Sequence, residues 1–93
     1  MSVTVRIPGP LRRITNGQEK VDVDCSNIQE CISSLEAEFP GFQERMLDES
    51  NELRYFVNVY VNGEDVRFLH GLATATKPGD EISIVPAVAG GLS

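Results

Sequence analysis

Histidine is nearly absent from this chain, and its scarcity removes several kinds of catalytic site. The single histidine, His70, lies between Leu69 and Gly71, with no ligand-like spacing to other side chains. A zinc site needs several imidazole or thiolate ligands, and a serine-type triad needs a histidine base. Ser26 and Ser33 therefore have no recognisable base, so we expect neither a metal site nor resident catalysis.

Basic residues are also few. Eight Lys and Arg stand against 14 Asp and Glu, which gives a formal net charge of -6. Binding to a phosphate backbone needs a basic surface, so we expect no nucleic-acid partner and instead a partner with a basic docking face. A carboxylate-rich stretch is interpreted mainly as a solvated face; its members are Glu36, Glu38, Glu44, Asp48, Glu49 and Glu52.

Long apolar runs are missing, and no stretch approaches the roughly 20 apolar residues of a membrane span. The N-terminus, Met1 to Arg6, has neither the basic segment nor the apolar run of a signal peptide. No glycine-rich phosphate loop is present, because neither a helix nor a lysine follows Gly90-Gly91. We expect a cytoplasmic protein with no membrane partner.

Two cysteines, Cys25 and Cys31, form neither a CxxC motif nor half of a recognisable zinc site. On one helix they would be about 9 Å apart along its axis, too far for an unstrained disulfide. The sequence therefore predicts free thiols in a reducing compartment. Cys25, near the start of a predicted helix, is the one whose thiol pKa a helix N-terminus could lower.

Hydrophobic periodicity predicts an α+β domain over residues 1–86, with one mixed sheet of 4–5 strands and one main helix on one face. Apolar side chains alternate in 3–7 and 57–61, and Ile28, Ile32, Leu35 and Phe39 recur at helical spacing. The helix is expected over Ser26–Phe39, with Ser26 and Gln29 as a capping box. The expected strands are 3–7, 18–24, 55–61, 66–68 and 81–85, with a turn at Asn62-Gly63. This element order fits a β-grasp arrangement, although other α+β topologies share it.

The C-terminus carries the clearest functional signal. Residues 87–93, Ala-Val-Ala-Gly-Gly-Leu-Ser, predict a flexible tail of small residues directly after a strand and Pro86. Glycine lacks a Cβ, so Gly90-Gly91 can enter a narrow slot that larger side chains would block. This suits a carboxylate that must reach into another enzyme's active site.

Nearly the whole chain resembles the MoaD/ThiS family of ubiquitin-like sulfur carriers, and most closely the carriers that serve cysteine biosynthesis. The stretches that carry the resemblance are 3–8, 35–37, 56–62, 64–68, 71–74 and 84–91. The resemblance implies a β-grasp fold and a carrier, not an enzyme, with no bound cofactor. Gly91 and Gly90 would form the reactive end, and Ala87, Val88 and Ala89 would enter the partner's active site.

The resemblance also implies partners. An adenylating enzyme of the ubiquitin-activating type would use ATP and magnesium to activate the Gly91 carboxylate. A sulfur donor enzyme would then supply the sulfur of a thiocarboxylate. The acceptor would be a pyridoxal-phosphate-dependent cysteine synthase holding an activated serine such as O-phosphoserine, or another sulfur-accepting synthase. We expect a monomer, because a carrier docks in turn on several partners.

The family's working form ends at the second glycine, whereas this sequence continues with Leu92 and Ser93. As written, the chain is expected to be a precursor, cut between Gly91 and Leu92 by a JAMM-type zinc metalloprotease. The other interpretation is that these two residues are left over from cloning.

Docking residues are predicted from the strand alternation. If Val57, Val59 and Val61 face the helix, then Phe56 and Tyr60 lie on the open face of the sheet, and Phe68 could join them. Exposed aromatic side chains of this kind are binding anchors in many interfaces. The alternative is that they only shield the sheet or pack beneath a loop.

Four functional alternatives stay open beside cysteine biosynthesis. Within the same class, the chain would serve molybdopterin synthase as its small subunit, or thiamin or thioacid siderophore synthesis. A ubiquitin-like protein modifier would form isopeptide bonds with lysines. An interaction module with an inert tail would be indifferent to a change of Gly91 to alanine. An autonomous enzyme is the least supported by the residues.

Overall fold

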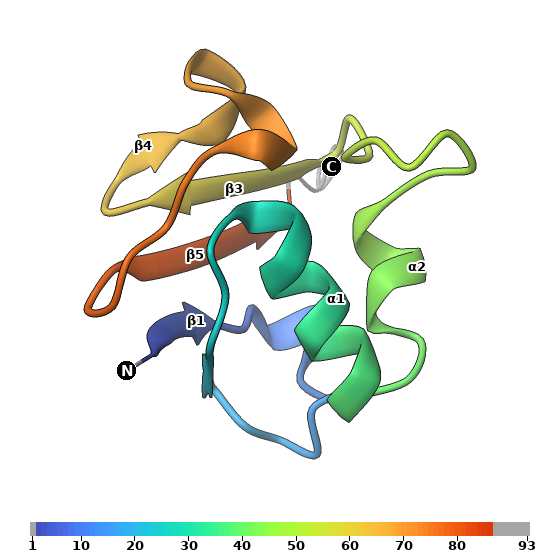
Figure 1. Cartoon of the computed structure of the whole chain (residues 1–93). Coiled ribbons are helices and arrows are strands. Elements are labelled where there is room, and N and C mark those ends of the chain that lie inside the picture. Colours follow the sequence, from blue (N-terminus) through green and yellow to red (C-terminus); the bar gives the residue numbers. More distant parts are fainter. Residues whose placement is uncertain (1, 87–93) are drawn as a thin grey trace.

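The computed structural model describes residues 2–86, which form one sheet and two α-helices. Within these residues the sheet order is β2-β1-β5-β3-β4, with β1 and β5 parallel and the other neighbours antiparallel. The strands are β1 (Val3–Arg6), β2 (Lys20–Val23), β3 (Val57–Val61), β4 (Glu64–Asp65) and β5 (Glu81–Pro86). Helix α1 (Ile28–Glu38) lies across one face of the sheet and α2 (Phe42–Met46) lies beside it (Figure 1). The predicted α+β fold, a mixed sheet with one main helix, is confirmed.

The core lies between α1 and the sheet, where strand alternation places it. Buried and more exposed residues alternate along β1, β3 and β5, so each strand turns one face inward. The predicted inward set Val57, Val59 and Val61 is buried. The apolar face of α1 covers it with Ile28, Cys31, Ile32 and Leu35. Burial of these side chains supplies most of the favourable free energy of folding.

Asn62 and Gly63 make the tight turn that the sequence predicts. Their φ values are 51° and 91°, and Val61 pairs directly with Glu64 across the turn. Positive φ at both central residues is what a type I′ hairpin requires.

The predicted strand at 66–68, however, is wrong. The strand that follows the turn, β4, covers Glu64–Asp65, and Val66–Phe68 forms a 3-10 helix, η2. The Asp65 side chain accepts a hydrogen bond from the Arg67 backbone N–H at 2.8 Å, which favours the turn over a continued strand.

Helix α1 begins later than predicted. Asn27, not Ser26, is the N-cap, and its side chain accepts a hydrogen bond from the Glu30 N–H at 2.8 Å. The Glu30 carboxylate accepts one from the Ser26 N–H at 2.9 Å, so the cap is shared by Asn27 and Glu30 rather than by Ser26 and Gln29. Cys25 lies before the helix, between β2 and the N-cap.

The prediction of free thiols is wrong: Cys25 and Cys31 form a disulfide, with their Cα atoms 5.2 Å apart. The spacing along a helix axis does not apply, because only Cys31 is helical. The hypothesis of a reactive Cys25 thiol fails with it, since a disulfide sulfur does not titrate. The bridge ties the segment after β2 to the first turns of α1.

A short helix, α2, follows α1 in a region where the sequence predicts no helix or strand. Phe42, Met46 and Leu47 are all buried, as expected for a segment packed on the core. Glu36 holds the start of α2, because its carboxylate accepts hydrogen bonds from the Gly41 and Gln43 N–H groups. Part of the carboxylate-rich stretch therefore serves as local helix and turn caps.

Candidate functional site at the end of strand β5

Strand β5 fixes the point from which the C-terminal tail departs. It is hydrogen-bonded to β1 on one side and β3 on the other, and its last residue, Pro86, pairs with Val57. Pro86 is also the last described residue. The predicted tail residues, Ala87 to Gly91, and the processing bond between Gly91 and Leu92 lie outside the described residues.

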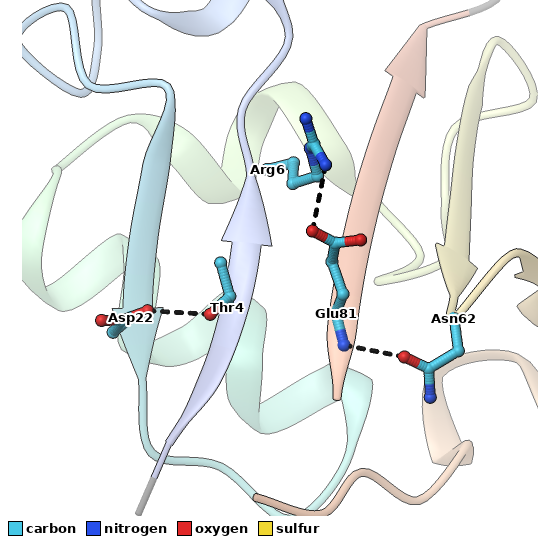
Figure 2. A network of polar contacts seen from close by, with 5 residues as sticks. All are labelled: Thr4, Arg6, Asp22, Asn62 and Glu81. Atoms are coloured by element: carbon cyan, nitrogen blue, oxygen red, sulfur yellow. Dashed lines mark hydrogen bonds and ion pairs between the residues drawn. The ribbon is translucent and has the colours of Figure 1, made fainter. Parts of the chain in front are cut away.

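The sheet face away from α1 is polar near the start of β5 (Figure 2). Thr4 donates to Asp22 at 3.0 Å, and Arg6 pairs with Glu81 at 3.0 Å. The Asn62 side chain accepts from the Glu81 N–H at 2.9 Å. The Arg6 and Glu81 side chains are 54% and 46% exposed, so this pair contributes at most about 1 kcal/mol. These contacts link neighbouring strands and do not form a reactive centre.

Asp80, in the turn before β5, has the one resolved pKa shift among the described groups. The Asn62 side-chain amide donates to its carboxylate at 3.0 Å, and the Lys77 N–H donates at 3.0 Å. Hydrogen bonds to the charged form, helped by the Lys77 charge, lower the pKa of Asp80 below its ordinary value. The turn residue Gly79 has φ 93°, as the third residue of a type II turn requires.

The three predicted docking residues occupy different environments. Tyr60 is half-buried on the open sheet face, between Asp65 and Ser83. Phe68 is 88% exposed on η2. Phe56 is 38% exposed, but it precedes β3 in a turn closed by the Val57 N–H and the Arg54 carbonyl, so strand alternation does not place it.

Sequence reasoning missed the neighbours of these aromatic residues. Tyr55 is 89% exposed and makes an edge contact with Phe56, with ring centroids 5.4 Å apart. Arg67 joins η2 to the turn before β3, since its guanidinium donates to the Asn58 side chain at 2.8 Å and to the Arg54 carbonyl at 2.7 Å. No periodic signal marks turn residues of this kind.

Neither a metal centre nor a membrane span appears among residues 2–86. No three His, Cys, Asp or Glu side chains gather there as a metal site. No helix there is both long enough and apolar enough to cross a membrane. His70 is an exposed residue before the 3-10 helix η3 (Gly71–Ala73).

Comparisons with known proteins bear on the tail as well as on the fold. The ThiS family model matches residues 5–91, and so ends at the second glycine. Sulfur carrier protein CysO of Mycobacterium tuberculosis is 52% identical over 93 residues, covering 98% of this chain and 100% of that protein.

A solved structure and a further relative extend the comparison. The crystal structure of the Amycolatopsis orientalis BexX/CysO complex matches with a TM-score of 0.91 and 45% identity, covering 96% of this chain and 99% of that chain. Small archaeal modifier protein 3 of Haloferax volcanii is 43% identical over 72 residues, covering 77% of this chain and 76% of that protein.

Proposed function

Because the chain belongs to the ThiS family, we propose that it is a sulfur carrier protein whose Gly91 bears the transferred sulfur as a thiocarboxylate. The observation that carries this is the full-length similarity to a sulfur carrier, 52% over 98% of the chain. The family match that ends at residue 91 supports Gly91 as the working terminus. In this role the domain supplies docking and reach, while partner enzymes supply the catalytic groups.

The chemistry needs activation because a carboxylate is a poor electrophile. A Gly91 carboxylate oxygen attacks the α-phosphorus of ATP on an adenylating enzyme, magnesium-dependent pyrophosphate release follows, and an acyl-adenylate forms. Sulfide sulfur then attacks the carbonyl carbon and AMP leaves, which gives the thiocarboxylate. If a sulfur donor enzyme supplies a persulfide instead, the attack joins that enzyme to Gly91 as an acyl disulfide. A thiol must then reduce this disulfide to release the thiocarboxylate. Gly90, with no side chain, lets the terminus enter the active site.

Removal of Leu92 and Ser93 must come first. While they remain, the Gly91 carbonyl is an amide and has no carboxylate oxygen to offer. Hydrolysis of the Gly91–Leu92 bond by a JAMM-type zinc metalloprotease creates that carboxylate.

Cysteine synthesis is the proposed destination of the sulfur, supported by the similarity to CysO. On a pyridoxal-phosphate-dependent synthase, the thiocarboxylate sulfur would replace the phosphate of an activated serine such as O-phosphoserine, and hydrolysis of the bond between Gly91 and the product would then release cysteine. Molybdopterin, thiamin or thioacid siderophore synthesis would use the same reactive end. The similarity to a small archaeal modifier protein favours one other candidate, conjugation of Gly91 to lysines of target proteins.

Intact-mass measurement tests the proposal. The full chain and a chain ending at Gly91 are incubated with the adenylating enzyme, ATP, magnesium and sulfide. The truncated chain should gain the mass of one sulfur-for-oxygen exchange, and the full chain should not change. No gain on either chain, with an adenylating enzyme that is active on another carrier, would refute the sulfur-carrier role. A ladder of protein conjugates in denaturing gels would instead support the modifier.

The exposed aromatic residues are the proposed docking points for these partners. Phe68→Ala should weaken binding to the adenylating enzyme without lowering the melting temperature, because 88% of Phe68 is already exposed. Tyr60→Ala and Phe56→Ala extend the test to half-buried positions, where a loss of stability with unchanged affinity would identify a packing role.

A further inference from the structure

A groove runs beside the last residue of β5, at the point where the tail begins. It has a volume of 360 Å³ and is formed by the 3-10 helix η1 (Gly9–Leu11), α2, the turn before β3, and the end of β5. We call it the root groove. Its lining residues include Pro10, Leu11, Arg45, Arg54, Phe56 and Pro86. The floor is apolar, since Leu11 and the adjoining Val57 and Ile84 belong to the core.

The root groove carries positively charged residues, whereas the chain as a whole has a negative net charge. The net charge is -6, yet two arginines, Arg45 and Arg54, line the groove. Among residues 2–86 the ion pair within 4.0 Å is Arg6–Glu81, on the open sheet face, so neither groove arginine has a carboxylate partner there. Glu44 also lines the groove, and it accepts from Arg54 through its backbone carbonyl.

Arg54 is held in place before any partner arrives. Its Nε donates to the Glu44 carbonyl at 2.9 Å, and its guanidinium carbon lies 6.0 Å from the centroid of the Phe56 ring. The Arg67 guanidinium donates to the Arg54 carbonyl at 2.7 Å, which fixes the backbone as well. A guanidinium positioned in this way presents its remaining N–H groups to a carboxylate with little further loss of side-chain entropy.

We propose that the root groove receives one apolar side chain of the adenylating enzyme, beside a carboxylate of that enzyme that pairs with Arg45 and Arg54. This rests on the proposed function and names the chemistry of the partner segment. The total charge favours a basic partner face, but the root groove requires an acidic and apolar one. Gly91 lies five residues beyond Pro86, so these two residues are at most about 18 Å apart. The acidic segment therefore lies within about that distance of the bound ATP.

Charge reversal with a matched control tests the inference. Arg45→Glu and Lys77→Glu each change the net charge equally at an exposed position, but Lys77 lies in the turn before β5 starts, away from the root groove. Both are made in a chain ending at Gly91. Affinity for the adenylating enzyme is measured calorimetrically without ATP at two salt concentrations, and KM and kcat are taken from pyrophosphate release.

Arg45→Glu should raise Kd and KM about tenfold or more and leave kcat within twofold, because like charges then meet across the interface. Its affinity should also lose salt dependence relative to wild type, whereas Lys77→Glu should behave as wild type. Phe56→Ala should raise Kd through the apolar half of the contact.

Equal effects of the two charge reversals, or no effect of either, would overturn the root groove as the docking point while adenylation of the wild type still upheld the proposed function. A wild-type chain that the enzyme neither binds nor adenylates would refute the proposed function itself.

Discussion

Reduction of the Cys25–Cys31 disulfide should lower the stability of the domain measurably. The two residues are 6 apart in sequence, and closing so short a loop in the unfolded chain corresponds to about 2 kcal/mol in the chain-entropy model. For a domain of this size each kcal/mol shifts Tm by about 4–8 °C, so reduction should lower Tm by about 8–16 °C. Cys31 stays in the core as a thiol, being 2% exposed, so little packing is lost.

The assay is thermal unfolding followed by circular dichroism, with and without a phosphine reductant, after mass spectrometry has counted free thiols in each sample. A Cys25→Ala/Cys31→Ala variant is the control, and its Tm should not respond to reductant. Equal Tm values for the oxidised and fully reduced wild type would refute the reasoning. Two free thiols in protein purified under air would show instead that the bridge does not form.

Three further predictions concern the fold. Phe42→Ala should cost about 3–5 kcal/mol, since Phe42 is 0% exposed; urea unfolding checks this, and a loss below 1 kcal/mol would contradict its place in the core. Gly63→Ala should destabilise by about 1 kcal/mol or more because φ is 91°, and an unchanged urea midpoint would speak against the type I′ turn. In acid, the free energy of unfolding should fall less steeply with pH in Asp80→Asn than in the wild type. The pKa of Asp80 is lowered in the folded state, so its ionised side chain stabilises the fold above the unfolded pKa near 3.8. That contribution disappears as pH falls through the folded pKa. Urea titrations between pH 5 and 2 measure it, and parallel pH curves for variant and wild type would exclude the contribution.

The elements that could be predicted from sequence are those fixed by local physics. Asn62 and Gly63 adopt positive φ at little energetic cost, which favours a tight turn. The alternation of Val57, Val59 and Val61 is typical of a strand with one buried face. The cysteine pairing was missed because the spacing along a helix axis applies only when both residues are helical, and Cys25 lies before α1.

The candidate site divides in the same way. Gly90-Gly91 is a signal written in consecutive residues, so the sequence alone points to it. The root groove brings together Leu11, Arg45 and Phe56, which belong to three separate segments and meet only in the folded domain. Arg54 belongs to no recognisable sequence pattern. Its side chain is oriented by a hydrogen bond to the backbone carbonyl of Glu44 in α2.

The central place of β5 has a consequence for synthesis of the chain. β5 bonds to β1 and β3, so it joins the pair β2–β1 to the pair β3–β4. A nascent chain without residues 81–86 leaves both pairs with open edges, so the sheet cannot be completed until these residues have left the ribosome. The residues that carry the tail are thus the residues that complete the fold. A chain truncated before residue 81 lacks the central strand, so it should not become a folded competitor for the partner enzymes.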